Sequence, residues 1–171
     1  MKFAWLMFLL IMNSALAETP RVEIGFVIKV YDGDTATVVS CGGIIHKVRL
    51  AKIDAPELKQ EFGHEAKTCL SDKILNRRVQ LHIISKDMYK RDVGEIFMEG
   101  NSVNNQMVEE GCAWVYEQYN DDFSLKGLQD KARLSRKGLW DSQSPIPPWA
   151  WRKLQKEQRK AEKELSWNLF L

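Results

Sequence analysis

The sequence is poor in the residues that build small metal-bound or disulfide-rich domains. Its 171 residues include three cysteines and three histidines. There is no Cys-x-x-Cys pair and no two histidines stand at helical spacing, which argues against a structural zinc site. Charges of the two signs nearly cancel, with 25 lysines and arginines against 23 acidic residues. The net charge therefore favours neither an acidic nor a basic partner, and any preference must come from a local cluster.

Long apolar runs are also lacking, with one exception at the N-terminus. Lys2 precedes the apolar run Phe3–Met12, and Ala15-Leu16-Ala17 follows it. This is the order of a secretory signal peptide, 1–17, cleaved after Ala17. A membrane-spanning helix needs about 20 apolar residues, so a signal anchor is the weaker alternative. We expect a monomer exported to the periplasm or the extracellular space, without stable membrane association after cleavage.

The three cysteines, Cys41, Cys69 and Cys112, would enter an oxidising compartment, where one disulfide and one free thiol are expected. We favour a disulfide between Cys69 and Cys112, because each lies in or at the end of a predicted helix, whereas Cys41 lies beside the turn Gly42-Gly43. Three reduced, buried cysteines remain the alternative, since spacing alone cannot fix connectivity.

Short alternating runs predict a β-rich first half. The residues 22–31 predict a half-buried strand with one apolar parity made of Ile24, Phe26, Ile28 and Val30. Asp32-Gly33 and Gly42-Gly43 are turn signals, so this region is predicted to be a three-stranded meander. The predicted strands are 22–31, 36–39, 44–50, 79–84 and 94–98, and the predicted helices are 60–76, 103–110 and 124–136.

Five short strands, with helices after the third and the fifth, are typical of a small Greek-key barrel of the oligonucleotide-binding type. We therefore predict an α+β fold over 18–142, a five-stranded oligonucleotide-binding-type β-barrel with three helices. A Pro-rich linker and a charged helical tail then occupy 143–171, where there are six basic residues and three glutamates. The tail is either an arm that contacts phosphates or a solvated appendage.

The stretch 48–57 concentrates charge at a bend that proline stiffens. Arg49 points away from the apolar face of its strand, and Pro56 holds Asp54 and Glu57 on the bend. A guanidinium and two carboxylates in this arrangement suit a phosphate together with a hard cation. An exposed salt bridge beside a turn explains the same residues, so this stretch alone does not identify a site.

Two further features point to the same chemistry. Asp34 follows the Asp32-Gly33 turn and is an acid that the turn does not need. Basic residues near these acids would form a phosphate-binding cluster if the fold gathers them, and a scattered solvated surface if it does not. They are Lys29, Lys47, Arg49, Lys52, Lys90 and Arg91.

Four motifs follow one another in a specific order. They are Asp32-Gly33-Asp34-Thr35, Arg49-Leu50-Ala51-Lys52-Ile53-Asp54-Ala55-Pro56-Glu57, Phe62-Gly63-His64-Glu65-Ala66 and Asp87-Met88-Tyr89-Lys90-Arg91. Val103-Asn104 and Glu110-Gly111-Cys112-Ala113 continue the pattern. In order and spacing, these motifs resemble the thermonuclease family, the staphylococcal-nuclease-like enzymes, over residues 22–140.

That resemblance implies a barrel that hydrolyses phosphodiester bonds of DNA or RNA, with one calcium ion or another divalent metal. By the same resemblance, the metal ligands are Asp34, Asp54 and the Ala55 carbonyl. Glu57 resembles the base that activates water, and Arg49 and Arg91 resemble two phosphate-binding arginines. Nucleotide contacts are expected from Tyr89 and from Tyr116 or Tyr119, and Lys52 is a further substrate-binding candidate among the basic residues.

The chain departs from the family at the Tyr89-Lys90-Arg91 loop, where Lys90 replaces a glycine and Asp92 follows. We expect the lysine to alter the loop and Asp92 to draw Arg91 into a local ion pair. The alternative functions are a non-catalytic oligonucleotide-binding barrel that holds nucleic acid, and a calcium-stabilised structural domain. The joint presence of two metal acids, a base and two arginines favours the nuclease.

Overall fold

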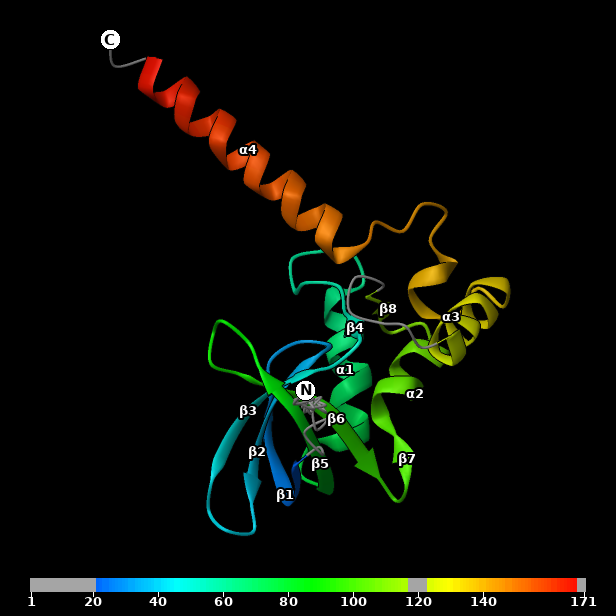
Figure 1. Ribbon diagram of the computed structural model, residues 1–171. Helices are drawn as coiled ribbons and strands as arrows, with labels where there is room; N and C mark the ends of the chain where they lie inside the picture. The colour runs from blue at the N-terminus through cyan, green and yellow to red at the C-terminus, as the bar shows by residue number, and fades with distance from the viewer. Residues whose placement is uncertain (1–20, 117–122, 169–171) are drawn as a thin grey trace, which may run out of the picture.

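The computed structural model describes residues 21–116 and 123–168, so the predicted signal peptide and Tyr119 lie outside the described residues. Its strands are β1 (Arg21–Val30), β2 (Thr35–Ser40), β3 (Ile45–Leu50), β4 (Ile53–Asp54), β5 (Arg78–Lys86), β6 (Asp92–Met98), β7 (Asn101–Ser102) and β8 (Trp114–Val115). Its helices are α1 (Gly63–Ile74), α2 (Val103–Glu109), α3 (Phe123–Leu134), the 3₁₀ helix η2 (Gly138–Asp141) and α4 (Pro148–Asn168). Figure 1 shows their arrangement.

The sheet closes into a five-stranded barrel. The strands follow the order β3-β2-β1-β5-β6, and a parallel pairing of β6 with β3 joins the two ends. In that pairing Arg49 lies opposite Val93, while the remaining neighbours are antiparallel. The predicted α+β barrel with three helices and a helical tail is therefore confirmed. The two-residue strands β4, β7 and β8 were not predicted, because so short a run carries no periodicity.

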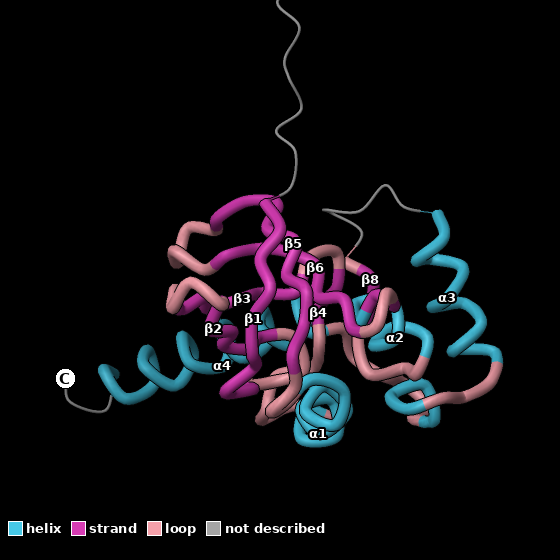
Figure 2. The backbone as a smooth tube through the Cα atoms, turned by 90° about the horizontal axis from the view of Figure 1, so that it is seen from below, coloured by secondary structure: helices cyan, strands magenta, loops and turns pink. Residues whose placement is uncertain are grey.

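The core lies between the barrel wall and α1. Aliphatic side chains of all five barrel strands are fully buried, among them Val27, Val38, Val48, Leu81 and Ile96. From α1, within the predicted helix 60–76, Ala66, Leu70 and Ile74 are buried in the same cluster. Figure 2 looks nearly along the axis of α1, which lies below the strands in that view. This packing fixes the loop that enters α1, and that loop carries Glu57.

The face of β1 that points inward is not the predicted one. Val27 is fully buried, whereas the residues of the predicted apolar face are 40%, 47% and 52% exposed at Ile24, Phe26 and Ile28. A Cβ at the buried Gly25 would come within 2.6 Å of the Val39 carbonyl oxygen, so β1 crosses β2 too closely for a side chain there. A register shift between Val27 and Lys29 then returns Val30 to the interior. Alternation identified the strand but not its inner face.

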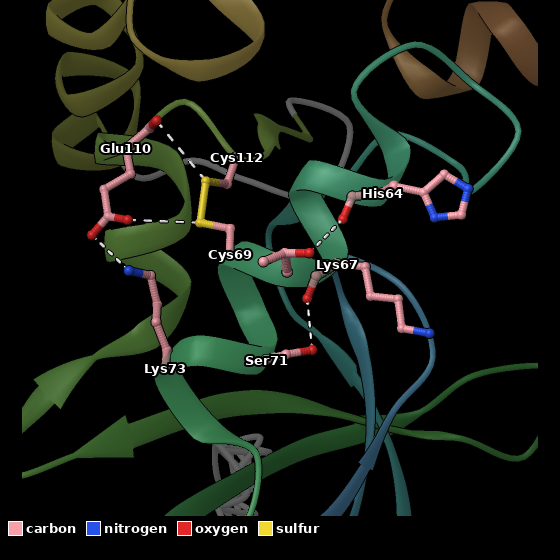
Figure 3. Close-up of a disulfide and its surroundings, with 8 residues drawn as sticks. His64, Lys67, Cys69, Ser71, Lys73, Glu110 and Cys112 are labelled. Atoms are coloured by element: carbon pink, nitrogen blue, oxygen red, sulfur yellow. Dashed lines mark hydrogen bonds and ion pairs between the residues drawn. A yellow bond between two sulfur atoms is a disulfide. The ribbon is translucent and has the colours of Figure 1, made fainter.

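A disulfide joins α1 to the segment after α2 (Figure 3). It links Cys69 to Cys112, the pair favoured from the sequence, with their Cα atoms 6.4 Å apart. Cys41 is exposed and carries a free thiol. An ion pair between Lys73 Nζ and Glu110 Oε1, at 2.6 Å, connects the same two elements. The bridge therefore holds together two helices that pack on the barrel.

The tail is a single helix of 21 residues, α4. It extends away from the barrel on the side opposite α3 (Figures 1 and 2). Within residues 21–116 and 123–168, no helix combines the length and the apolar composition needed to cross a bilayer. The domain boundary at 142 stays a prediction.

Candidate active site

Two buried aspartates from separate strands approach each other at one end of the barrel. Asp34 immediately precedes β2 and is 6% exposed, and Asp54 ends β4 and is 1% exposed. The Ala55 N–H donates to Asp34 Oδ2 over 2.8 Å. A Cβ at Gly33 would lie 2.6 Å from the Ala55 Cβ, so glycine lets the turn pack against this segment. The fold thus brings together the three residues predicted to hold a metal.

Arg49 connects the two aspartates. Its Nη2 donates to Asp54 Oδ1 over 2.8 Å, and its Nη1 lies 3.1 Å from Asp34 Oδ2. The same Nη1 donates to the carbonyl oxygens of Leu50 and Ile53, each at 2.9 Å. The side chain is only 15% exposed. Arg49 therefore positions both carboxylates, and part of its guanidinium is already committed to the backbone.

The acids at this end of the barrel carry more negative charge than Arg49 alone offsets. Burial raises the pKa of Asp54 above its usual range, against the lowering effect of its arginine neighbours. Burial and the nearby Asp34 carboxylate raise the pKa of Asp32 from 3.8 to about 6. Crowded carboxylates in a low-dielectric site favour either protonation or a bound cation. Hard oxygen donors of this kind suit calcium, so the residues present fit the predicted ion.

Glu57 lies on the loop between β4 and α1, and the loop has a defined conformation. The Gln60 N–H donates to the Glu57 carbonyl over 2.8 Å. A Cβ at Gly63 would overlap that same carbonyl, so only glycine fits there. The Glu57 side chain is 37% exposed. It is therefore within reach of water, as a general base requires.

A residue that the sequence did not single out completes the cluster. Arg152, the fifth residue of α4, donates from Nη2 to Asp54 Oδ2 over 2.7 Å and from Nη1 to Glu57 Oε1 over 2.8 Å. Burial alone would lower the pKa of Arg152, but these hydrogen bonds raise it further above its ordinary value. One guanidinium thus bridges a predicted metal ligand and the predicted base.

The start of α4 is anchored on the domain by aromatic contacts. The Trp149 ring stacks on Tyr116, with centroids 5.6 Å apart and planes 18° from parallel. It also meets Trp114 edge-on, at 5.8 Å. Before the helix, the Gln60 side chain donates to the Ile146 carbonyl over 2.6 Å. These contacts hold Arg152 at the site, and the Pro-Pro-Trp run before it was the sequence signal that could have suggested an anchored tail.

The predicted substrate-binding residues differ in their accessibility. Tyr89 is 72% exposed on the β5–β6 loop, whereas one face of Tyr116 is stacked on Trp149. Lys52 forms an ion pair with Glu95 at 2.8 Å. Among the other basic candidates, the ammonium groups of Lys29 and Lys47 lie over the Tyr31 ring, at 4.6 and 4.8 Å from its centroid. These basic residues therefore contact other side chains of the same protein.

Arg91 pairs with Asp87 and not with Asp92. Its Nε donates to Asp87 Oδ2 over 2.7 Å, and its guanidinium carbon lies 5.6 Å from the Tyr89 ring centroid. Lys90 has a φ of 63°, in the left-handed region that favours glycine. The lysine therefore keeps a conformation that suits glycine at this position. Within the described residues, no hydrogen bond or ion pair joins Arg91 to Asp34 or Asp54.

Asp92 has other partners, so the expected Arg91–Asp92 pair is wrong. Lys86 Nζ lies 2.6 Å from one carboxylate oxygen and His46 Nδ1 lies 2.9 Å from the other. Burial by itself would raise the pKa of Asp92, but these two hydrogen bonds lower it overall. Arg91 immediately precedes β6, in which Val93 pairs in register with Arg49. The ion pair of Arg91 is with Asp87 on its own loop.

Comparison with known proteins gives consistent matches. Residues 47–142 match the family described as staphylococcal nuclease homologue. An uncharacterized endonuclease of Escherichia coli is 40% identical over 129 residues, which cover 75% of this chain and 84% of that protein. A second uncharacterized endonuclease, from Haemophilus influenzae, is 40% identical over 130 residues, or 76% of this chain and 73% of that one. The staphylococcal-like nuclease CAN1 of Arabidopsis thaliana is 36% identical over 107 residues, 63% of this chain and 33% of its own length.

Proposed function

Because this chain belongs to the staphylococcal nuclease homologue family, we propose that it is an exported, calcium-dependent nuclease that hydrolyses phosphodiester bonds of DNA or RNA. The observation that carries the proposal is the convergence of Asp34, Asp54 and Glu57 around two arginines. These groups come from separate elements of the fold. Together they supply hard oxygen ligands, a base and a phosphate-binding guanidinium in one place.

The carboxylates of Asp34 and Asp54, with the Ala55 carbonyl, are the groups that would hold the ion. When bound, it would polarise a phosphate oxygen and help to orient a water molecule for attack. The burial of both aspartates keeps their negative charge unscreened by solvent. A calcium ion takes about 6 to 8 oxygen ligands, so three from the protein leave room for water and substrate.

Glu57 is the group that would accept the proton of the attacking water. Its carboxylate accepts a hydrogen bond from Arg152 Nη1, and it must exchange this contact for water before it can act as a base. Arg49 is rigidly held and presents its remaining N–H groups next to the aspartates. Arg91, on the exposed loop between β5 and β6, would add a second guanidinium that can bind phosphate. Such preorganised donors stabilise the charge that develops on phosphate in the transition state.

The test is direct cleavage. The purified protein is incubated with single- and double-stranded DNA and RNA, with calcium or with a chelator. We expect cleavage with calcium, no cleavage with chelator, and turnover of Glu57→Gln lower by about 10²–10⁴-fold. Glu61→Gln, a change at an exposed acid four residues away, is the control. No cleavage with any divalent metal would contradict the proposal, and binding without cleavage would support the non-catalytic barrel.

Export is proposed from the charge and apolar order of 1–17. N-terminal sequencing of protein recovered outside the cytoplasm should begin at Glu18. An N-terminus at Met1, or retention in the cytoplasm, would contradict this part of the proposal.

A further inference from the structure

Four of the six basic residues of α4 lie along one side of the helix. Arg152, Lys156, Arg159 and Lys163 follow the spacing i, i+4, i+7 and i+11, which keeps them within about 60° of the helix circumference. The three glutamates of α4 project outside that sector. We call these four residues the α4 basic row. Its first member is the arginine that contacts Asp54 and Glu57.

The row leads from the site into solvent. All side chains from Lys156 to Trp167 are exposed, and Figure 1 shows α4 leaving the barrel as a projecting helix. From Arg152 to Lys163 the helix rises about 16 Å. Most of the stability of a helix in a protein comes from packing an apolar face, and from Lys156 to Trp167 the exposed part of α4 has no such packing.

We propose that the α4 basic row binds the phosphates of the nucleic acid strand that flanks the cleaved bond, with Arg152 at its catalytic end. This inference rests on the proposed function and extends its substrate site. At about 3.4 Å per nucleotide along one stacked strand, the row spans about five nucleotides. Lysine and arginine side chains on one exposed helix side meet a phosphate backbone without reading its sequence.

Arg152 fixes the position of the α4 basic row relative to the proposed catalytic residues. Its guanidinium already lies beside the residues that would hold the metal and activate the water. A cation on Asp54 would compete with Arg152 for that carboxylate and leave its fork to a phosphate, the anion that a planar guanidinium matches best. The remaining three cations then follow the strand outward.

A strand of nucleic acid fits the row better than an anionic membrane does. The apolar residues on the opposite side of α4 are few, chiefly Leu154 and Leu165, which are 46% and 66% exposed. A helix that lies in a membrane interface needs a continuous apolar face. Moreover, the row begins at Arg152, which contacts Asp54 and Glu57 in the proposed nuclease site.

The experiment compares two double variants of α4 that remove the same charge. Lys156→Gln/Lys163→Gln removes two cations from the row. The matched control, Lys153→Gln/Lys160→Gln, removes two from the neighbouring side, where Lys160 makes only a long exposed pair with Glu164, at 3.8 Å. Fluorescence anisotropy in chelator measures binding of labelled single strands of four and twelve nucleotides over a series of salt concentrations. Circular dichroism checks that all proteins keep their helix content.

For the row variant we expect affinity for the twelve-nucleotide strand to fall about tenfold, and the slope of log affinity against log salt to become shallower by about 1.4, or 0.7 for each lost phosphate contact. The control should stay within about twofold of the parent protein. The parent should also bind the longer strand more tightly than the shorter one, and the row variant should lose most of that gain.

Three outcomes would overturn the inference. An equal loss in both variants would show only general charge attraction, and no loss in either would make α4 a solvated appendage. Row-dependent binding to vesicles containing anionic lipid, without strand binding, would assign the row to a membrane. Because binding is measured without cleavage, failure here leaves the nuclease proposal standing. Conversely, a protein that never cleaves but shows the predicted salt slopes would contradict that proposal and keep the row.

Discussion

Arg152 and Asp54 are 98 residues apart in the sequence, yet Arg152 donates to both carboxylate oxygens of Asp54, at 2.7 and 3.3 Å. Asp54 also receives a hydrogen bond from Arg49. Its negative charge is therefore shared between a fixed arginine of the barrel and an arginine of a helix that enters from the C-terminal tail. Any cation that uses Asp54 must compete with the second of these.

Arg152→Met should therefore bind calcium more tightly than the parent protein. A hydrogen bond between charged groups contributes about 1.5–3 kcal/mol, and we take the lower value because Arg152 is 41% exposed. This corresponds to about a tenfold increase in affinity. Calorimetric titration with calcium measures it, with Lys153→Met as the matched control. Unchanged or weaker binding would show that Arg152 does not compete with the ion.

Arg49→Lys should lose both turnover and stability. A lysine cannot present a fork to two carboxylates, nor replace the hydrogen bonds to the Leu50 and Ile53 carbonyls. We expect turnover to fall by about 10²–10³-fold and thermal unfolding to occur at a lower temperature. Arg78→Lys, at an exposed arginine of β5, is the control. Near-normal turnover would refute the role given to Arg49.

Asp32→Asn should stabilise the metal-free protein at neutral pH. The pKa of Asp32 is raised from 3.8 to about 6, so ionising it costs more in the folded protein than in the unfolded chain. That cost is absent below about pH 4 and complete above about pH 6. Asparagine can still accept the Asp34 N–H, as Asp32 Oδ1 does.

Urea unfolding in chelator measures the Asp32→Asn effect. The variant should be more stable by about 1–3 kcal/mol at pH 7.5 and equal to the parent at pH 3.5. Asp72→Asn, at an exposed acid of α1, should show no such difference. A variant less stable than the parent at pH 7.5 would mean that the carboxylate itself is needed in the turn.

Removing the disulfide should destabilise the fold without rearranging the site. The bridge closes a loop between residues 43 positions apart, for which loop entropy predicts a loss of about 2–4 kcal/mol in Cys69→Ser/Cys112→Ser. Cys41→Ser is the control. Under denaturing, non-reducing conditions the parent protein should expose one reactive thiol, and detection of three would contradict the bridge.

Much of the fold follows from local patterns in the sequence. The turns at Asp32-Gly33 and Gly42-Gly43, the alternation of the strands and the helical spacing of Ala66, Leu70 and Ile74 predicted the elements in their order. Local patterns do not show which face of a strand points inward, so the face of β1 was predicted wrongly. Gly25 decides that face, because β2 passes too close for any side chain.

Part of the site was predicted from the resemblance of its motifs to the staphylococcal-nuclease-like family. Arg49, Asp54 and Glu57 lie within nine residues, and the bend that carries them is a local feature. The partner of Arg91 could not be chosen from sequence, because Asp87 and Asp92 are both within hydrogen-bonding reach along the chain. The loop conformation, with Lys90 at a φ of 63°, selects Asp87.

The sequence by itself therefore predicted the barrel, because short-range periodicity and turn chemistry encode its strands and helices. The resemblance of its motifs to a known family predicted the roles of the two aspartates, the base and the arginine between them. Only the tertiary structure decided that α4 enters the site. The contacts of Arg152 with Asp54 and Glu57, and of Trp149 with Tyr116, join segments separated by more than thirty residues. Such contacts depend on how the linker packs on the domain, and no local pattern specifies that packing.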